Sequence, residues 1–317
     1  MLRYALGRVV QAAMVLWATY TVSFVVLYRI PGDAVLERTR YEPTDITAEQ
    51  MNTLRAEYGL DQSLVSQYLH RTADVLTGDL GRSLVNGRPV VELIGEALPW
   101  TLQIAGLALV VGLFFGAGLA LLANYVQAGW LRQALLSLPP LGVAVPSFWL
   151  GLVLLQIFSF RITWFPATGH GGWRTMALPA ITLAIPIGAQ IAQVFAKSLE
   201  QALAETYIQT ARAKGLGHGR ILVGHATRNA TLPALTIFGL VVGDLFAGSV
   251  IIETVFSRNG IGQLTAASIS AQDMPVVQGL VLLAAIVYVL VNLAVDLTYP
   301  LLDPRVARLS RPVPSGA

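Results

Sequence analysis

A basic, glycine-rich segment at 205–233 interrupts an otherwise apolar part of the chain. Its cationic and imidazole side chains are Arg212, Lys214, His218, Arg220, His225 and Arg228. Small residues gather within it at Ala211, Ala213, Gly215 and Gly217. A basic loop can lie on anionic lipid or simply follow the cytoplasmic bias of basic residues, but lipid binding favours bulky apolar side chains. The small residues favour entry into a socket, so we interpret the segment as a docking site for a cytoplasmic protein.

Asp244 is the one charged side chain within the apolar spans described below. An acid at the centre of a membrane costs about 2.5–3.5 kcal/mol on insertion scales, so it should face a helix bundle or a water-filled cavity. Either it bonds to a neighbouring helix, or it meets a substrate amine or cation on a translocation path. Weaker candidates for the same path are Gln190, Gln193, Asn292 and Asp296.

Several kinds of chemistry lack the residues they need. The chain has no cysteine and only two lysines, and no phosphate-binding G-x-x-x-x-G-K-[ST] sequence occurs. Neither G-x-S-x-G nor H-E-x-x-H is present, and His218 and His225 have no acid between them to complete a metal site. We therefore expect no catalytic residue, metal or cofactor in this chain. Energy for uphill movement would come from another chain or from an ion gradient.

The composition is that of a membrane protein. Hydrophobic residues make up 55% of the 317 residues and charged residues only 12%, against about 25% in soluble domains. The basic residues are scattered among apolar spans, which excludes a nucleic-acid-binding face.

Six apolar segments are long enough to cross a bilayer, which needs roughly 20 residues. They are 9–27, 100–122, 133–160, 175–196, 231–252 and 274–295. The third contains Pro139, Pro140 and Pro146, so we expect it to be kinked or to be preceded by a broken turn. The spacings Gly112-Leu-Phe-Phe-Gly116 and Gly239-Leu-Val-Val-Gly243 predict close helix packing.

The distribution of Lys and Arg predicts the orientation. Eleven lie at the termini and in the loops on one side, against three in the short loops on the other. Both termini and the segment 205–233 are therefore expected in the cytoplasm. The polar segment 31–98 then lies outside, where patterns at 47–58 and 63–76 predict helices. This segment is either a passive lid or a surface that receives a soluble partner.

The basic segment itself has a helical pattern. Within residues 200–213 the apolar side chains gather on one face of a helix. This pattern predicts a single helix, which Gly215 and Gly217 end. A second short helix is expected at about 219–230, before the fifth span begins at Leu232-Pro233.

The order of residues in this segment carries a resemblance to a known family. It reads Tyr207-Ile208-x-Thr210-Ala211-Arg212-Ala213-Lys214-Gly215-Leu216-Gly217, then His225-Ala226-x-Arg228-Asn229-Ala230-x-Leu232-Pro233. This resembles the cytoplasmic coupling loop of binding-protein-dependent ABC importer permeases, in the dipeptide/oligopeptide/nickel branch. Agreeing sequences elsewhere include Pro31-Gly32-Asp33, Gly59-Leu60-Asp61-Gln62, Gly78-Asp79-Leu80-Gly81-x-Ser83, Pro146-Ser147-Phe148, Leu178-Pro179-Ala180, Glu253-x-x-Phe256, Gly260-x-Gly262, Asp273-x-Pro275-x-Val277-Gln278-Gly279 and Asp303-Pro304-Arg305. The long first outer segment resembles the B-type subunit.

The resemblance implies an all-α membrane subunit with six transmembrane helices, at home in the bacterial inner membrane. It implies a heterodimer with a homologous permease, two ABC ATPase subunits that bind ATP and Mg, and an extracytoplasmic solute-binding protein. The residues implied to contact an ATPase are Tyr207, Thr210, Ala211, Arg212, Ala213, Lys214, Gly215, Leu216, Gly217 and Arg220. The expected organisation is an anchor helix at 1–30, an outer helical insertion at 31–98, a core at 99–302 with the coupling loop at 200–233, and a tail at 303–317.

The implied substrate is a di- or oligopeptide, because this branch imports such solutes. Nickel chelates, haem and other small solutes remain alternatives with the same machinery. An ion-gradient-driven secondary transporter is the alternative of a different class. It would need internal repeats, of which the sequence shows none, or ion-binding acids, of which only Asp244 is available.

Overall fold

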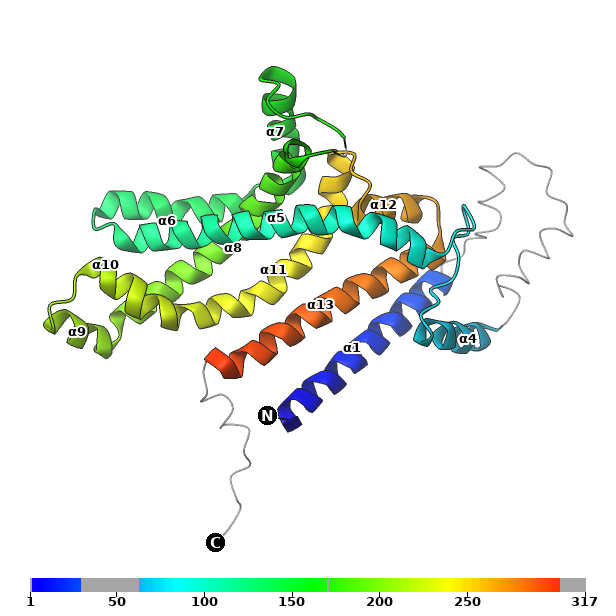
Figure 1. Cartoon of the computed structure of the whole chain (residues 1–317), viewed down its shortest axis with the longest axis horizontal. Coiled ribbons are helices and arrows are strands. Elements are labelled where there is room, and N and C mark those ends of the chain that lie inside the picture. The colour runs from blue at the N-terminus through cyan, green and yellow to red at the C-terminus, as the bar shows by residue number, and fades with distance from the viewer. Residues whose placement is uncertain (1, 30–62, 170, 303–317) are drawn as a thin grey trace, which may run out of the picture.

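The computed structural model describes residues 2–29, 63–169 and 171–302, and the regular elements in these ranges are helices (Figure 1). They are α1 (Leu2–Arg29), α4 (Leu64–Leu76), α5 (Val90–Tyr125), α6 (Gly129–Ala144), α7 (Ser147–Leu154), the π-helical η1 (Leu155–Arg161), α8 (Trp173–Ala204), α9 (Thr206–Ala213), α10 (His218–Ile221), the π-helical η2 (Leu222–Ala226), α11 (Thr227–Val255), α12 (Ile261–Ser270) and α13 (Met274–Leu302). The prediction of an all-helical protein is confirmed for this part of the chain.

Four of these helices, α1, α5, α8 and α13, are long and apolar enough to cross a membrane, and the bent pair of α6 with α7 and η1 makes a fifth if it is counted as one span. The expected span at 231–252 lies inside α11, and α11 is not among the four helices or the bent pair just named. Helices α9 and α10 lie at the same end of the molecule as the start of α1 and the end of α13, whereas α4 and α12 lie toward the opposite end (Figure 1).

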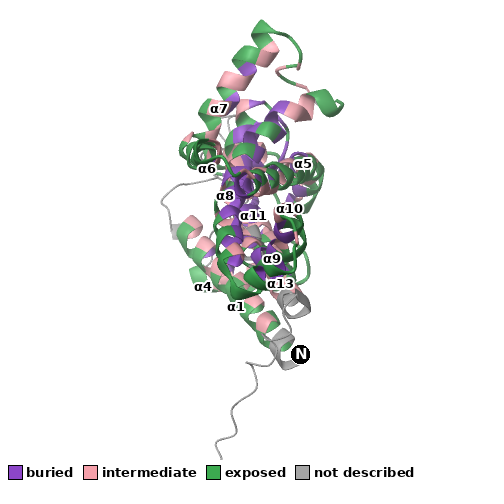
Figure 2. Ribbon diagram, turned by 90° about the vertical axis from the view of Figure 1, so that its left-hand side faces the viewer, coloured by how far each residue is buried: buried purple, intermediate pink, exposed green. Residues whose placement is uncertain are grey.

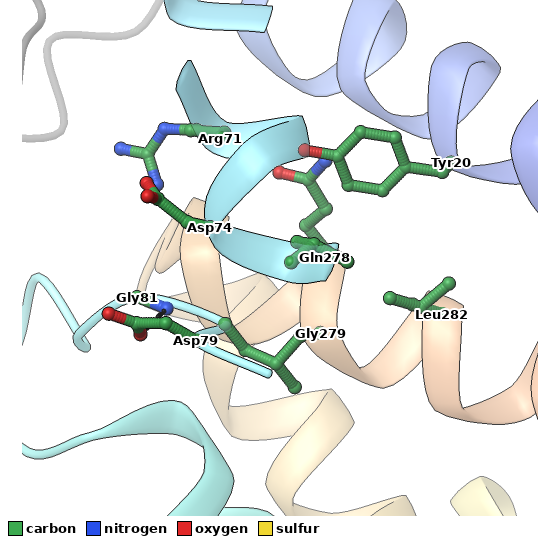
Figure 3. Close-up of a pocket in the computed structure, with 10 residues that line it drawn as sticks. Tyr20, Arg71, Asp74, Asp79, Gly81, Gln278, Gly279 and Leu282 are labelled. Atoms are coloured by element: carbon green, nitrogen blue, oxygen red, sulfur yellow. Dashed lines mark hydrogen bonds between the residues drawn. The ribbon is translucent and has the colours of Figure 1, made fainter. Parts of the chain in front are cut away.

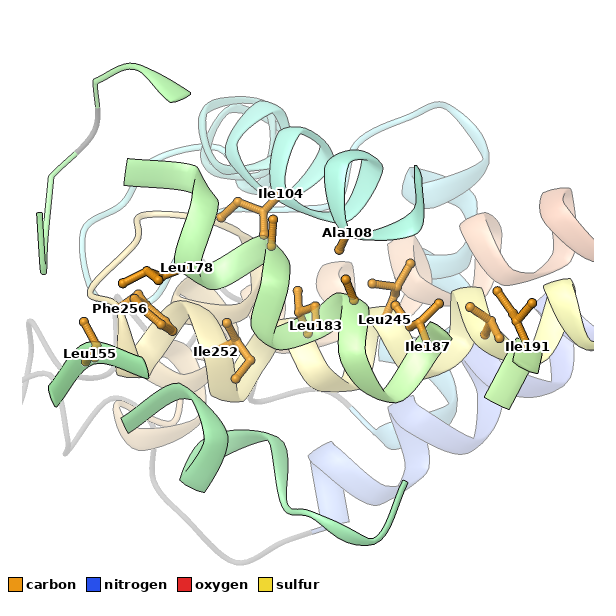
Figure 4. Packing of buried hydrophobic residues seen from close by; sticks show 13 residues of the cluster. Ile104, Ala108, Leu155, Leu178, Leu183, Ile187, Ile191, Leu245, Ile252 and Phe256 are labelled. Atoms are coloured by element: carbon orange, nitrogen blue, oxygen red, sulfur yellow. The ribbon is translucent and has the colours of Figure 1, made fainter. Parts of the chain in front are cut away.

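Helix α8 is the centre of the bundle and packs against α5, α11 and α6. Two thirds of its most apolar stretch is buried (67%), compared with 11% for α1. Figure 2 shows the buried residues along the middle of the molecule and exposed ones on the outer helices. Between α8 and its neighbours lies an apolar cluster that includes Ile104 of α5, Leu183 and Ile187 of α8, and Ile252 of α11 (Figure 4).

Glycines allow α5 to approach α8 closely. A Cβ atom at Gly116 would collide with the carbonyl group of Gly188, and one at Gly112 would lie 2.9 Å from the Ile187 Cγ2. In α11, a Cβ at Gly239 would collide with Asn292 of α13. Both small-xxx-small spacings therefore lie at helix contacts, as predicted.

The third expected span is broken rather than gently kinked. Helices α6 and α7 meet at an angle of 99°. Val145 is extended (ψ 122°) because the residue before a proline avoids helical ψ, and Pro146 is the N-cap residue before α7. Pro139 and Pro140 lie inside α6 without ending it. The prolines thus indicated an irregular span, and the structure shows a break inside the span at Pro146.

The outer part of the chain is described from residue 63 onward. Ser63 caps α4 by accepting a hydrogen bond from the Ser66 N–H, and the helix ends at Leu76, which confirms the prediction for 63–76. The Thr21 hydroxyl of α1 lies 2.8 Å from the Tyr68 hydroxyl of α4. The helix predicted at 47–58, the sequences at 31–33, 59–62 and 303–305, and the tail at 303–317 lie outside the described residues.

Candidate functional site

The basic segment begins with a break that the sequence pattern did not predict. A single helix was expected over 200–213, but α8 ends at Ala204 and α9 begins at Thr206. Glu205 between them is extended (φ −67°, ψ 150°), so α9 leaves the axis of α8. The prediction of one continuous helix is wrong, because glutamate is a good helix former and nothing local in the sequence marks the turn.

The end of α9 is fixed by backbone hydrogen bonds. The Leu216 N–H donates to the Ala211 carbonyl (3.2 Å) and the Gly215 N–H donates to the Arg212 carbonyl (2.9 Å). This is the Schellman pattern, in which the residue at the glycine position has a positive φ. Gly215 has φ +78°, a conformation that costs other residues about 1–2 kcal/mol. The predicted end of the helix at the glycines is confirmed with this mechanism.

The second arm of the segment runs directly into the bundle. Helix α10 is followed without interruption by η2 and by α11, where Pro233 lies inside the helix. Residues 219–230 are helical as predicted, but this helix is not short, because it continues through Leu232 and Pro233 into the expected span. One helical rod, from His218 to Val255, joins the turn to the core.

A small apolar base holds α9 against this rod. Ile208, Ala211 and Ile221 are buried together, and Leu203 and Leu216 pack on them. The Asn229 side-chain amide donates to the Tyr207 hydroxyl at 2.7 Å. Because both arms are tied, the turn at 211–217 is a defined protrusion of the fold.

The rod is also tied to the end of α5. The His218 Nε2 donates to the Asn124 carbonyl at 3.0 Å, and the Asn124 side chain donates to the Ala120 and Ala196 carbonyls. His218 thus has a structural partner 94 residues away along the chain. Sequence reasoning missed Asn124 because a lone asparagine near a helix end carries no signal of a distant contact.

The exposed side chains of the turn are mostly small or basic. Arg212, Lys214 and Arg220 are exposed, as are Thr210, Ala213, Gly215 and Gly217. Cβ atoms added at Gly215 or Gly217 would meet nothing within 4 Å. Of the remaining predicted residues, Tyr207 is also exposed, while Ala211 and Leu216 belong to the base. The structure therefore brings all ten predicted docking residues into one protrusion, with its cations facing outward.

The intramembrane candidates do not form one cluster. The Gln190 side-chain amide of α8 donates to the Asp244 carboxylate of α11 at 3.0 Å, and Gln193 is exposed one turn further along α8. Asn292 instead donates to the Tyr288 carbonyl within α13 and lies against Gly239. Asp296 is 3.2 Å from Arg8 of α1 and joins those two helices. Only Gln190 and Gln193 accompany Asp244.

A buried polar cluster lies near α12 at the opposite end from the turn. The Glu253 carboxylate is fully buried and accepts hydrogen bonds from the Thr101 hydroxyl and from the Gly262 and Gln263 N–H groups. Arg258 is also buried, donates to the Gly169 carbonyl and lies over the Trp100 ring. Burial lowers the pKa of the Arg258 guanidinium, while the nearby Glu253 charge opposes the shift.

A second buried carboxylate ties the outer segment to the bundle. Asp273, before α13, accepts hydrogen bonds from the Ser83 hydroxyl and the Leu84 N–H. Two of the sequences that carry the family resemblance, at 78–83 and 273–279, therefore meet in space. Their residues were not named as a site from the sequence, because the partners lie 190 residues apart.

One small pocket lies where α1, α4 and α13 meet (Figure 3). Tyr20 of α1, Arg71 and Asp74 of α4, Asp79, and Gln278 of α13 are among the residues that line it. Its volume of about 30 Å³ has room for roughly two water molecules. In the part of the chain that the structure describes, no three His, Cys, Asp or Glu side chains are grouped to hold a metal.

Comparison with known proteins identifies relatives along nearly the whole chain. Residues 108–308 match the family described as binding-protein-dependent transport system inner membrane component, and residues 1–105 match its N-terminal companion. The glutathione transport system permease protein GsiC of Escherichia coli O6:H1 is 32% identical over 96% of this chain and 99% of its own length. A putative peptide transport system permease protein of Brucella suis biovar 1 is 35% identical over 95% and 98%. A solved amino acid ABC transporter aligns with 68% of this chain and 94% of its own, at 17% identity and a TM-score of 0.48.

Proposed function

The chain belongs to the family of binding-protein-dependent transport system inner membrane components and is a permease of an ABC importer; we propose that it forms, with a homologous second permease, the membrane path for di- or oligopeptides. Relatives that match over nearly their full length are named as glutathione and putative peptide transport permeases, which supports a peptide substrate. A solute-binding protein would deliver the peptide from outside.

The proposed layout has six transmembrane helices in the bacterial inner membrane, with both termini and the loop at 200–233 in the cytoplasm. The excess of basic residues in that loop and at the termini supports this orientation. The arrangement of α9 and α10 at the same end as the start of α1 agrees with it (Figure 1). Helix α11 would be the fifth span, and the broken pair of α6 and α7 the third.

The protrusion at 207–220 is the observation that carries the proposed coupling to ATP. It combines outward-facing Arg212 and Lys214, a glycine turn with open space around it, and an apolar base that holds it rigid. We assign it as the element that docks into an ATPase subunit. Because α10 continues into α11 through helical backbone, displacement of the docked turn would move a core helix directly.

The mechanism that follows is a two-state switch. Closure of two ATPase subunits on ATP and Mg would draw the docked turns of the two permeases together and change which side of the membrane the path opens to. This chain supplies no nucleotide-binding loop, so ATP hydrolysis is assigned to the partner subunits.

The test compares two substitutions at one glycine in the complex purified with its native partners. Gly215→Ala and Gly215→Trp both strain the positive φ, but only tryptophan fills the open space around the turn. We expect Gly215→Trp to abolish the ATP hydrolysis that the binding protein stimulates, and Gly215→Ala to retain most of it. Equal stimulation in wild type and Gly215→Trp would refute the docking assignment.

A further inference from the structure

The Asp244–Gln190 pair lies deep between the two ends of the bundle. Gln190 is 17 residues beyond Trp173, the first residue of α8, and Asp244 is 17 residues beyond Thr227, the first residue of α11. With a rise of 1.5 Å per residue, each is roughly 25 Å along its helix. Both residues also lie inside the apolar segments expected to cross the membrane, 175–196 and 231–252, so the pair lies within the proposed membrane-spanning part of the bundle.

The carboxylate lies at the surface of this chain rather than in its core. Around it, Ile187 and Ile191 of α8 and Val241 and Leu245 of α11 are buried in the central apolar cluster. Asp244 is exposed and belongs to the stripe of α11 that also carries the exposed side chains Leu240, Ala247 and Ile251. A carboxylate facing lipid at this depth costs about 2.5–3.5 kcal/mol. This face therefore meets water or another protein.

The pair has unused hydrogen-bonding capacity. A carboxylate has about four acceptor positions, and among the described residues the Gln190 amide is the one donor to Asp244. No ion pair to Asp244 occurs within the described ranges. The Gln190 side chain still offers its carbonyl oxygen, and Gln193 offers an exposed amide one turn away. The group as a whole is rich in acceptors and carries a negative charge.

We propose that Asp244, Gln190 and Gln193 form a site on the translocation path that binds the ammonium group of the passing peptide. An ammonium has three N–H donors, which suit a carboxylate and a neighbouring amide oxygen. The Gln193 amide can donate to and accept from a peptide backbone whatever its side chains, so the site would select the free amino end and not the sequence. The inference rests on the proposed function and adds a residue-level basis for selectivity within the membrane.

The experiment measures uptake of a mixture of di-, tri- and tetra-alanine by cells that express the whole importer, with mass spectrometry of the imported peptides. Asp244→Asn keeps the shape and removes the charge, whereas Asp244→Glu keeps the charge. Asp296→Asn is the matched control, since its carboxylate is paired with Arg8 of the same chain. We expect uptake to fall about tenfold in Asp244→Asn, to be largely retained in Asp244→Glu and to stay within about twofold in Asp296→Asn. Co-purification of the partner subunits should not change.

The other outcomes distinguish failure of the proposed peptide transport from failure of the Asp244 site. If wild-type cells import none of the peptides, the proposed peptide function fails and this site fails with it. If wild type and Asp244→Asn import equally, the site alone is refuted. Loss of the second permease from purified Asp244→Asn would show that the carboxylate pairs with a partner subunit, which would also overturn the site. An equal loss of uptake in Asp296→Asn would remove the special role of Asp244.

Discussion

The two ends of this bundle use charged residues in opposite ways. At the end that carries α9 and α10, Arg212, Lys214 and Arg220 are exposed, and backbone bonds and apolar packing hold the turn. At the other end, Glu253, Arg258 and Asp273 are almost fully buried and hold the loops around α12 by hydrogen bonds.

This difference indicates what each end is built to do. A buried carboxylate whose acceptor positions are taken by its own chain fixes a structure and has little left for a partner. Exposed cations on a rigid base contribute little to folding and remain available for an anionic or complementary surface. We therefore expect substitutions at the outer end to lower the stability of the protein, and substitutions in the turn to weaken binding to a partner.

Glu253→Ala should have the largest effect on stability. It leaves the Thr101 hydroxyl and the Gly262 N–H without their acceptor in a buried site, at about 1–3 kcal/mol for each group. The measurement is the apparent thermal unfolding midpoint of the purified complex in detergent. Thr254→Ala, at the exposed neighbouring residue, is the control, and a midpoint as low in the control would remove the special role of the buried cluster.

Ser83→Ala should have an intermediate effect. It removes the hydroxyl that donates to Asp273 and accepts from the Val85 and Asn86 N–H groups, while the Leu84 N–H still reaches Asp273. We expect a loss of about 1–2 kcal/mol in unfolding free energy. Ser137→Ala, an exposed serine of α6, should stay within about 0.5 kcal/mol. Equal behaviour of the two serines would contradict the proposed tie between the outer segment and α13.

Gly215→Ala should cost about 1 kcal/mol, because alanine at φ +78° is strained while its methyl group has open space. Gly217→Ala is the matched control, since Gly217 has an ordinary φ of −68° and equally open surroundings. The same detergent unfolding assay checks both. A Gly217→Ala variant as unstable as Gly215→Ala would show that the left-handed conformation is not the cause.

Arg212→Glu combined with Lys214→Glu should have the smallest effect on stability, within about 0.5 kcal/mol, because both side chains are exposed. Recovery of ATPase subunits with the purified permease should nevertheless fall at least about tenfold. Arg161→Glu, an exposed reversal at the end of η1, serves as the control. Full recovery of the ATPases with the double variant would contradict the claim that the exposed cations of the turn serve to bind a partner.

The parts predictable from sequence were those governed by local rules. Ser63 before an amphipathic stretch, Pro146 in an apolar run and Gly215 after a helical face each marked a boundary that the structure contains. The glycine pairs at 112/116 and 239/243 marked helix contacts for the same reason, since only a missing side chain permits the approach.

What the sequence could not show depends on distant partners. Glu205 leaves helical conformation although its neighbours favour a helix. The contacts of His218 with Asn124, of Thr101 with Glu253 and of Ser83 with Asp273 join residues 94 to 190 positions apart. No local pattern encodes such pairs. The pairing of Asp244 with Gln190 was foreseen only as an unspecified hydrogen bond to a neighbouring helix.

The most direct test of the account uses the absence of cysteine from this chain. Ala213→Cys places a single thiol on the exposed turn, and a thiol-reactive photo-crosslinker attached there is activated in native membranes, with mass spectrometry of the products. The account predicts crosslinks to a subunit that carries a phosphate-binding ATPase loop, and none from a matched thiol introduced by Thr168→Cys, at an exposed residue outside the turn. Crosslinks from position 213 only to lipid, in a complex that still contains the ATPase, would contradict the claim that this turn couples the permease to ATP.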